Sequence, residues 1–126
     1  MTGYNHQDKE LEGILSQDGD VLEIGHGYSV RFRIKKVPKS PQRPHGLDYA
    51  LTMHAPGGRR LVGYDNAHVP EELQSRSKVG RQAQACDHIH YENLRVKLYD
   101  FRTPGDLMVD FWVSVEAKLK EEGIDE

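Results

Sequence analysis

Two short polar stretches of the sequence carry residue types that acid–base chemistry uses. Their members are Tyr64, Asp65, Asn66 and His68 in YDNAH, and His88 and His90 in DHIHY. Because an unperturbed histidine has a pKa of about 6.5, two of them can hold opposite protonation states at neutral pH. Such a pair can cleave RNA through its own 2′-hydroxyl, with Tyr64 able to replace one of them. These six residues are therefore the predicted catalytic set, and this chemistry needs no cofactor.

The period of a β-strand decides which of these side chains can meet. Residues two apart point to the same side of a strand, so His88 and His90 project together while Asp87 points the other way. Asp65 lies near the end of its own predicted strand, and His68 follows in a loop. If the two strands are neighbours, Asp65 or His68 comes within reach of the histidine pair.

Two other interpretations of the same residues remain open. A His-x-His pair with a carboxylate resembles two-histidine-one-carboxylate metal sites, with Asp65, His88 and His90 as the ligands. The polar residues can also be no more than a hydrogen-bonded surface, which would leave a non-catalytic interaction module. We favour catalysis over metal binding because no third histidine has the spacing of a closed metal site.

Positive charge is concentrated in one part of the chain. The net charge of −3 argues mildly against a dedicated nucleic-acid-binding protein, but no acidic residue lies between Ile24 and Leu47. The strand predicted there presents its cations on one face: Arg31, Arg33 and Lys35. This face is predicted to contact a phosphate backbone, or an acidic partner if the protein is an interaction module.

The elements that must position these residues are mostly strands. Residues 11–25 are predicted to form two strands around a turn at Asp18-Gly19. Residues 28–37 alternate apolar and charged side chains, which is the pattern of a half-buried strand. Residues 47–55 and 59–65 flank a Pro-Gly-Gly turn. Residues 88–91 and 95–101 are predicted to form two further short strands, or one bent strand interrupted near Glu92-Asn93.

The end of the sequence predicts an amphipathic helix. Thr103, Pro104 and Asp106 form the N-terminal signal, and Gly123 is a plausible stop. Between them, apolar residues recur on one helical stripe that includes Phe111. The predicted fold is α+β, an antiparallel meander sheet packed by this C-terminal helix.

Length and composition place the chain among globular proteins. Its 126 residues suit one domain spanning residues 1–126, and 37% hydrophobic with 29% charged residues fits a folded protein. No apolar run reaches the roughly 20 residues that a membrane helix needs. The lone Cys86 and the lack of a secretory signal predict a cytoplasmic protein with no membrane contact.

The order of these motifs is similar to that of the TumE-type toxins of bacterial toxin–antitoxin pairs. The resemblance runs from about Tyr28 to Leu119. Its most specific pieces are the tripeptide at residues 64–66, the His-x-His pair at 88–90 and the Phe-Trp pair at 111–112. One departure is the segment from Val69 to Ala85, which is long for this connection and could cover the site as a flap.

The resemblance implies a small cytoplasmic toxin with a helix-turn-helix antitoxin as its partner, and RNA as a plausible target. Carried over by position, the matched polar residues are Tyr64, Asp65, Asn66, His88 and His90, with His68 a weaker match. These statements are expectations from the family likeness and not from the spacing of the residues.

Overall fold

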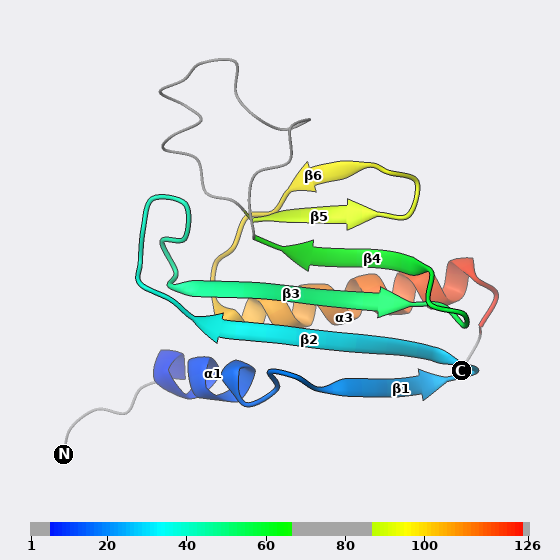
Figure 1. Cartoon of the computed structure of the whole chain (residues 1–126), viewed down its shortest axis with the longest axis horizontal. Helices are drawn as coiled ribbons and strands as arrows, with labels where there is room; N and C mark the ends of the chain where they lie inside the picture. Colours follow the sequence, from blue (N-terminus) through cyan, green and yellow to red (C-terminus); the bar gives the residue numbers. More distant parts are fainter. Residues whose placement is uncertain (1–5, 67–86, 125–126) are drawn as a thin grey trace.

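The structure is a computed structural model that describes residues 6–66 and 87–124. Within these ranges six strands form one antiparallel sheet in the order of the sequence, with one helix before them and one after (Figure 1). The elements are α1 (His6–Leu15), β1 (Val21–Gly25), β2 (Tyr28–Lys36), β3 (Leu47–His54), β4 (Arg60–Asp65), β5 (His88–Tyr91), β6 (Val96–Leu98) and α3 (Pro104–Glu121). The α+β meander with a C-terminal helix is therefore confirmed.

Within the described residues, the sheet has one covered face and one open face. In the view of Figure 1, α3 lies behind the sheet, and neither described helix lies in front of it. Alternate residues of β2 and β3 are buried against the helix side, which gives the core its period of two. Phe111 of α3 is fully buried and packs edge-on against Phe32 and Tyr64, with ring centroids 5.8 Å apart in both pairs.

Helix α3 begins and ends close to where its sequence signals predict. The Oγ1 of Thr103 accepts a hydrogen bond from the backbone N–H of Asp106 at 3.0 Å, and Pro104 occupies the first turn. Gly123 follows the helix with a φ of 83°, the left-handed conformation common after a helix end. The N-terminal cap and the stop at Gly123 are confirmed.

The beginning of the chain differs from the prediction, because residues 6–15 form helix α1 where the first strand of a hairpin was expected. Leu11, Ile14 and Leu15 recur at helical spacing, and all three pack against the core. The turn at Asp18-Gly19 is present, but it joins a helix to β1. Short apolar runs do not distinguish a helix from a strand, and here the packing of α1 against α3 and β2 decides.

The remaining turns agree with the sequence. Gly57 and Gly58 take positive φ between β3 and β4, and β5 and β6 are two separate short strands. The long connection at 69–85 lies outside the described residues. Neither described helix combines the length and the apolar character that crossing a membrane requires.

Candidate functional site

Asp65, His88 and His90 meet on the open face of the sheet. The register pairs Asp65 with His88 and Gly63 with His90, so all three side chains project from the face opposite α3. Asp65 Oδ1 lies 2.7 Å from His88 Nε2, and Asp65 Oδ2 lies 3.5 Å from His90 Nε2. The convergence predicted for Asp65 and the histidine pair is thus present, and we call these three residues the open-face triad.

The two imidazoles of the open-face triad differ in exposure. Their rings pack edge to face with centroids 4.6 Å apart. The His88 side chain is 3% exposed, whereas that of His90 is 25% exposed and that of Asp65 is 18% exposed. His90 is therefore the histidine that a large substrate could reach, and Asp65 connects it to the buried His88.

Tyr64 does not face the open-face triad. It precedes Asp65 on β4 and so points to the helix side, where its hydroxyl lies 2.6 Å from Ser114 Oγ and 3.2 Å from the carbonyl of Asp110. Burial raises the pKa of this hydroxyl, although the hydrogen bond with Ser114 partly opposes the rise. The side chain is a core aromatic group that ties β4 to α3.

Asn66 also lies apart from the open-face triad. The Asn66 side chain is fully buried, accepts from the N–H of Tyr49 at 3.0 Å and donates to the carbonyl of Leu47 at 2.6 Å. It therefore closes the end of the β3–β4 ladder, which is a structural task. His68 lies outside the described residues, so its predicted role stays a prediction.

Three cations of β2, at positions 31, 33 and 35, lie on the same face as the open-face triad, but two of them are neutralised. Arg33 contacts Asp48 at 3.3 Å, and Lys35 contacts Asp18 at 2.6 Å. Arg31 makes no ion pair with any residue of ranges 6–66 and 87–124. Of the three predicted phosphate contacts, Arg31 thus has the greatest freedom to bind an anion.

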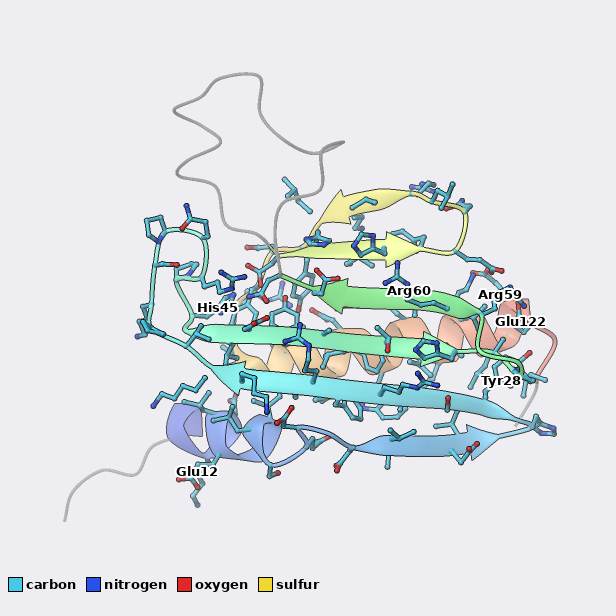
Figure 2. The ribbon with its side chains drawn as sticks, viewed as in Figure 1. Glu12, Tyr28, His45, Arg59, Arg60 and Glu122 are labelled. Atoms are coloured by element: carbon cyan, nitrogen blue, oxygen red, sulfur yellow. The ribbon has the colours of Figure 1, made fainter. Side chains whose placement is uncertain are left out.

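Arg60 is a second cation beside the open-face triad, and the sequence reasoning did not single it out. A Cβ placed on Gly63 would lie 3.5 Å from Arg60 Cδ and 3.6 Å from its Nη1, so the arginine extends over the glycine (Figure 2). Gly63 is paired with Thr52 on one side and His90 on the other. Gly63 was the signal in the sequence that a neighbouring side chain could lie there. A glycine has no side chain, so it leaves space on the strand between its polar cross-strand neighbours Thr52 and His90.

A second histidine–aspartate cluster lies on the covered side of the sheet. Its aspartate, Asp87, directly precedes His88 of the open-face triad in the sequence. Asp87 Oδ2 accepts hydrogen bonds from the Tyr49 hydroxyl at 2.7 Å and from His45 Nε2 at 2.8 Å. The N–H of Leu47 donates to His45 Nδ1 at 3.2 Å, which places the imidazole proton on Nε2. His45 also stacks on Phe101 with centroids 4.0 Å apart. We call His45, Tyr49 and Asp87 the covered cluster.

The side chains of the covered cluster are held by one another, and His45 also lines a groove of about 600 Å³ together with Phe101 and Lys36. Both ring nitrogens of His45 are engaged, and Asp87 is 2% exposed. Burial raises the pKa of the Tyr49 hydroxyl far above its ordinary value, and the Asp87 carboxylate reinforces the rise. The prediction from the strand period that Asp87 points away from His88 is confirmed. The hydrogen bonds of the cluster join β3 and the start of β5 to the loop that carries His45.

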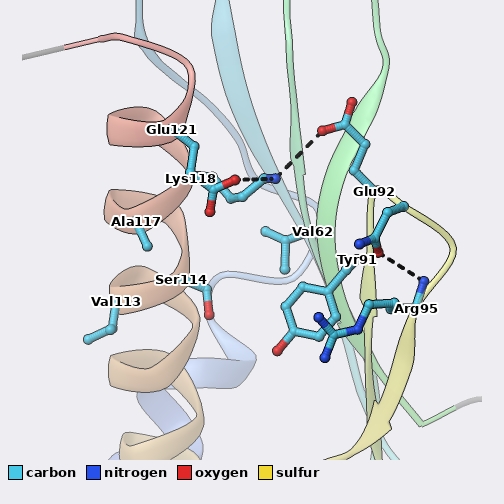
Figure 3. Close-up of a pocket in the computed structure, with 10 residues that line it drawn as sticks. Val62, Tyr91, Glu92, Arg95, Val113, Ser114, Ala117, Lys118 and Glu121 are labelled. Atoms are coloured by element: carbon cyan, nitrogen blue, oxygen red, sulfur yellow. Dashed lines mark hydrogen bonds and ion pairs between the residues drawn. The ribbon is translucent and has the colours of Figure 1, made fainter.

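A groove lies on the covered side, away from the open-face triad. It has a volume of about 800 Å³ and runs between α3 and the β5–β6 hairpin (Figure 3). Val62, Tyr91 and Val113 form part of its wall, and Lys118 crosses it to contact Glu92 at 3.6 Å. This groove is lined by Glu92, Lys118 and Glu121 and by none of the three residues of the open-face triad.

The fold and the open-face triad define a small α+β domain with a polar centre on the sheet face that neither described helix covers. Comparison with known proteins agrees with this: the model of the family described as Toxin TumE matches residues 14–119. The chain belongs to the TumE toxin family, which marks it as the toxin of a toxin–antitoxin pair and implies an antitoxin partner. No curated protein and no solved structure matches the chain.

Proposed function

We propose that this toxin cleaves RNA by histidine acid–base chemistry, with the open-face triad as its catalytic centre. The observation that carries the proposal is the carboxylate of Asp65 between two imidazoles, 2.7 Å from His88 Nε2 and 3.5 Å from His90 Nε2. A carboxylate that orients an imidazole and stabilises its protonated form is the arrangement that makes histidine an effective base. The uncovered sheet supports access by a polymer.

His90 is the proposed general base because it is the most exposed of the three. It takes the proton of the RNA 2′-hydroxyl as that oxygen attacks the adjacent phosphorus. The new 2′-O–P bond forms while the P–O5′ bond breaks, and the proton passes from His90 to the departing 5′ oxygen. Asp65 stabilises the imidazolium at 3.5 Å, and His88 fixes Asp65 through its 2.7 Å hydrogen bond. The products are a 2′,3′-cyclic phosphate and a 5′-hydroxyl.

Arg60 and Arg31 are the proposed phosphate contacts. The register aligns Arg31, Thr52, Gly63 and His90 in one row across four strands, and Arg60 fills the space over Gly63. Guanidinium groups bind phosphate oxygens well because they donate in a planar fork. The row would therefore lead an RNA backbone toward His90, whereas Arg33 and Lys35 contribute less because carboxylates already hold them.

The proposed setting is the cytoplasm, with a helix-turn-helix antitoxin as the neutralising partner. The family supports an antitoxin, and the helix-turn-helix type is our expectation for it. A short helix-turn-helix reading frame next to this gene would support the assignment. Co-expression should then restore the growth of cells that the toxin arrests, and an adjacent protein that fails to do so would contradict it.

The direct test uses an oligoribonucleotide and purified toxin, with and without a chelator. We expect cleavage in both conditions and products that end in a 2′,3′-cyclic phosphate and a 5′-hydroxyl. The matched control replaces the nucleotide on the 5′ side of the cleaved bond by its 2′-deoxy form, which removes the attacking oxygen and should stop cleavage there. Intact RNA in both conditions, or cleavage of the deoxy control, would refute the mechanism.

A further inference from the structure

The open-face triad offers a second property, because its polar atoms also suit a metal ion. One oxygen of Asp65 and one nitrogen each of His88 and His90 all lie within 4.8 Å of one another. The donors come from two neighbouring strands whose register is fixed by the ladder, so the backbone holds them in place. Two imidazoles and one carboxylate form a donor set that first-row transition metals prefer over magnesium or calcium.

The distances between the donors approach those of a metal site. With Zn–N and Zn–O bonds of about 2.0–2.1 Å, two ligands in a tetrahedral site are roughly 3.3 Å apart. The pair Asp65 Oδ2 and His90 Nε2 is 3.5 Å apart, and the pair Asp65 Oδ1 and His88 Nε2 is 2.7 Å apart. An ion would replace the shorter hydrogen bond and widen it by about 0.6 Å, which a side-chain rotation can provide.

We infer that Asp65, His88 and His90 bind one divalent transition-metal ion such as Zn²⁺, and that this ion inhibits the toxin. The inhibition rests on the proposed function. A metal–nitrogen bond takes the lone pair of His90 Nε2, the nitrogen that faces Asp65, and leaves the proton of the neutral ring on Nδ1, so neither ring nitrogen can then accept the 2′-hydroxyl proton. Because the three side chains leave at least one coordination position open, water or a phosphate oxygen completes the site. Metal binding and base catalysis are thus alternative states of one imidazole ring.

The test titrates Zn²⁺ into tag-free protein that has first been freed of metal, and follows binding by calorimetry. We expect one ion per chain, and a roughly tenfold or greater loss of affinity in Asp65→Asn and, separately, in His90→Gln. Cobalt titration provides a second readout, since Co²⁺ bound by these donors acquires visible absorption bands. The control is His54→Gln, a histidine on the same face that bonds Thr52 Oγ1 at 2.9 Å instead of the triad.

The outcomes separate the metal site from the proposed nuclease. Less than one ion per chain, or binding that survives Asp65→Asn and His90→Gln but falls in His54→Gln, would overturn the metal site. Such a result would leave RNA cleavage untouched. With one Zn²⁺ bound, we expect RNA cleavage to fall in proportion to occupancy and to return with chelator. Continued cleavage at full occupancy would overturn the inhibition and the role of His90 as base, while the metal site itself would stand.

Discussion

Two histidine–aspartate clusters lie on opposite sides of the same sheet, supplied by consecutive residues at the start of β5. In the covered cluster, Asp87 is 2% exposed and both nitrogens of His45 are engaged. In the open-face triad, the side chains of Asp65 and His90 are 18% and 25% exposed. Histidine and aspartate thus form a buried, hydrogen-bonded structural cluster on one side of the sheet and an accessible polar centre on the other.

The difference follows from what each cluster faces. The covered cluster lies against Phe101 and the loop that carries His45, so its groups must satisfy one another to offset the cost of burial. The open-face triad lies on the face that neither described helix covers, and solvent reaches two of its members. Exposure and access, more than residue type, separate the histidine that can react from the histidine that holds the fold.

The largest expected effect is on catalysis and separates the two histidines. His90→Gln should lower RNA cleavage by about 100-fold or more, because the general base is lost. His45→Gln should leave the cleavage rate of the folded protein within a few-fold of wild type, although it weakens the fold. Single-turnover rates on one oligoribonucleotide, measured below the unfolding temperature of each variant, make the comparison. Equal loss in both would erase the distinction drawn between the clusters.

The next effect is on stability and separates the two aspartates. Asp87→Ala should cost about 3–5 kcal/mol of the free energy of unfolding, because it leaves the Tyr49 hydroxyl and the His45 N–H buried without their acceptor. Asp65→Ala should cost roughly 1 kcal/mol, since its carboxylate is partly solvated. Denaturant titration gives both values, and a larger loss for Asp65→Ala would reverse the assignment.

The covered cluster also predicts an alkaline limit to stability. The pKa of Tyr49 is raised in the folded protein, mainly by burial and then by Asp87, so its contribution is complete below the unfolded value near 10. Above that pH the unfolded chain ionises and the folded one does not, which costs about 1.4 kcal/mol per pH unit for this tyrosine. Tyr49→Phe should lower stability at neutral pH and flatten the decline above pH 10. Denaturant titrations from neutral pH upward would measure the free energy of unfolding of both proteins. A decline above pH 10 that is equally steep in wild type and in Tyr49→Phe would contradict the prediction.

The smallest effect concerns RNA affinity on the open face. Arg31→Gln and Arg60→Gln should each weaken RNA binding and reduce its salt slope by about 0.7, the value for one lost contact to a single strand. Arg33→Gln is the matched control, because Asp48 already neutralises that arginine. Binding to a non-cleavable 2′-deoxy oligonucleotide at several salt concentrations gives the slopes. A larger change in Arg33→Gln would show that the row through Gly63 is not the path of the backbone.

The sequence predicted the sheet well because its information was local. The alternation in β2, the Pro-Gly-Gly turn and the Thr103 cap each depend on a few neighbouring residues, and all are present. Helix α1 was mistaken for a strand because its short apolar run fits both periods, and only its packing on α3 selects the helix.

The sequence predicted part of the site, because the alternation of side chains along a strand is also local information. Period two placed His88 and His90 together, and strand adjacency brought Asp65 to them. Tyr64 and Asn66 were grouped with Asp65 because they are its neighbours in the sequence. Alternation along the strand turns Tyr64 to the core, and Asn66 forms hydrogen bonds at the end of the β3–β4 ladder. The positions of Arg60 and His45 could be found only from the folded structure. Arg60 lies over a glycine three residues further along the chain, and His45 contacts Asp87, which is 42 residues away in the sequence.

The meander order has a consequence for when the protein becomes active during synthesis. Every strand pairs only with its sequence neighbours, so the sheet can assemble hairpin by hairpin as the chain leaves the ribosome. The aromatic anchor Phe111, however, belongs to α3, which emerges after all six strands. A nascent chain ending before Thr103 should therefore lack a sealed core and a rigid open face. Harm to the host would begin only after translation has passed the last helix, and protease digestion of stalled chains of graded length would reveal that threshold.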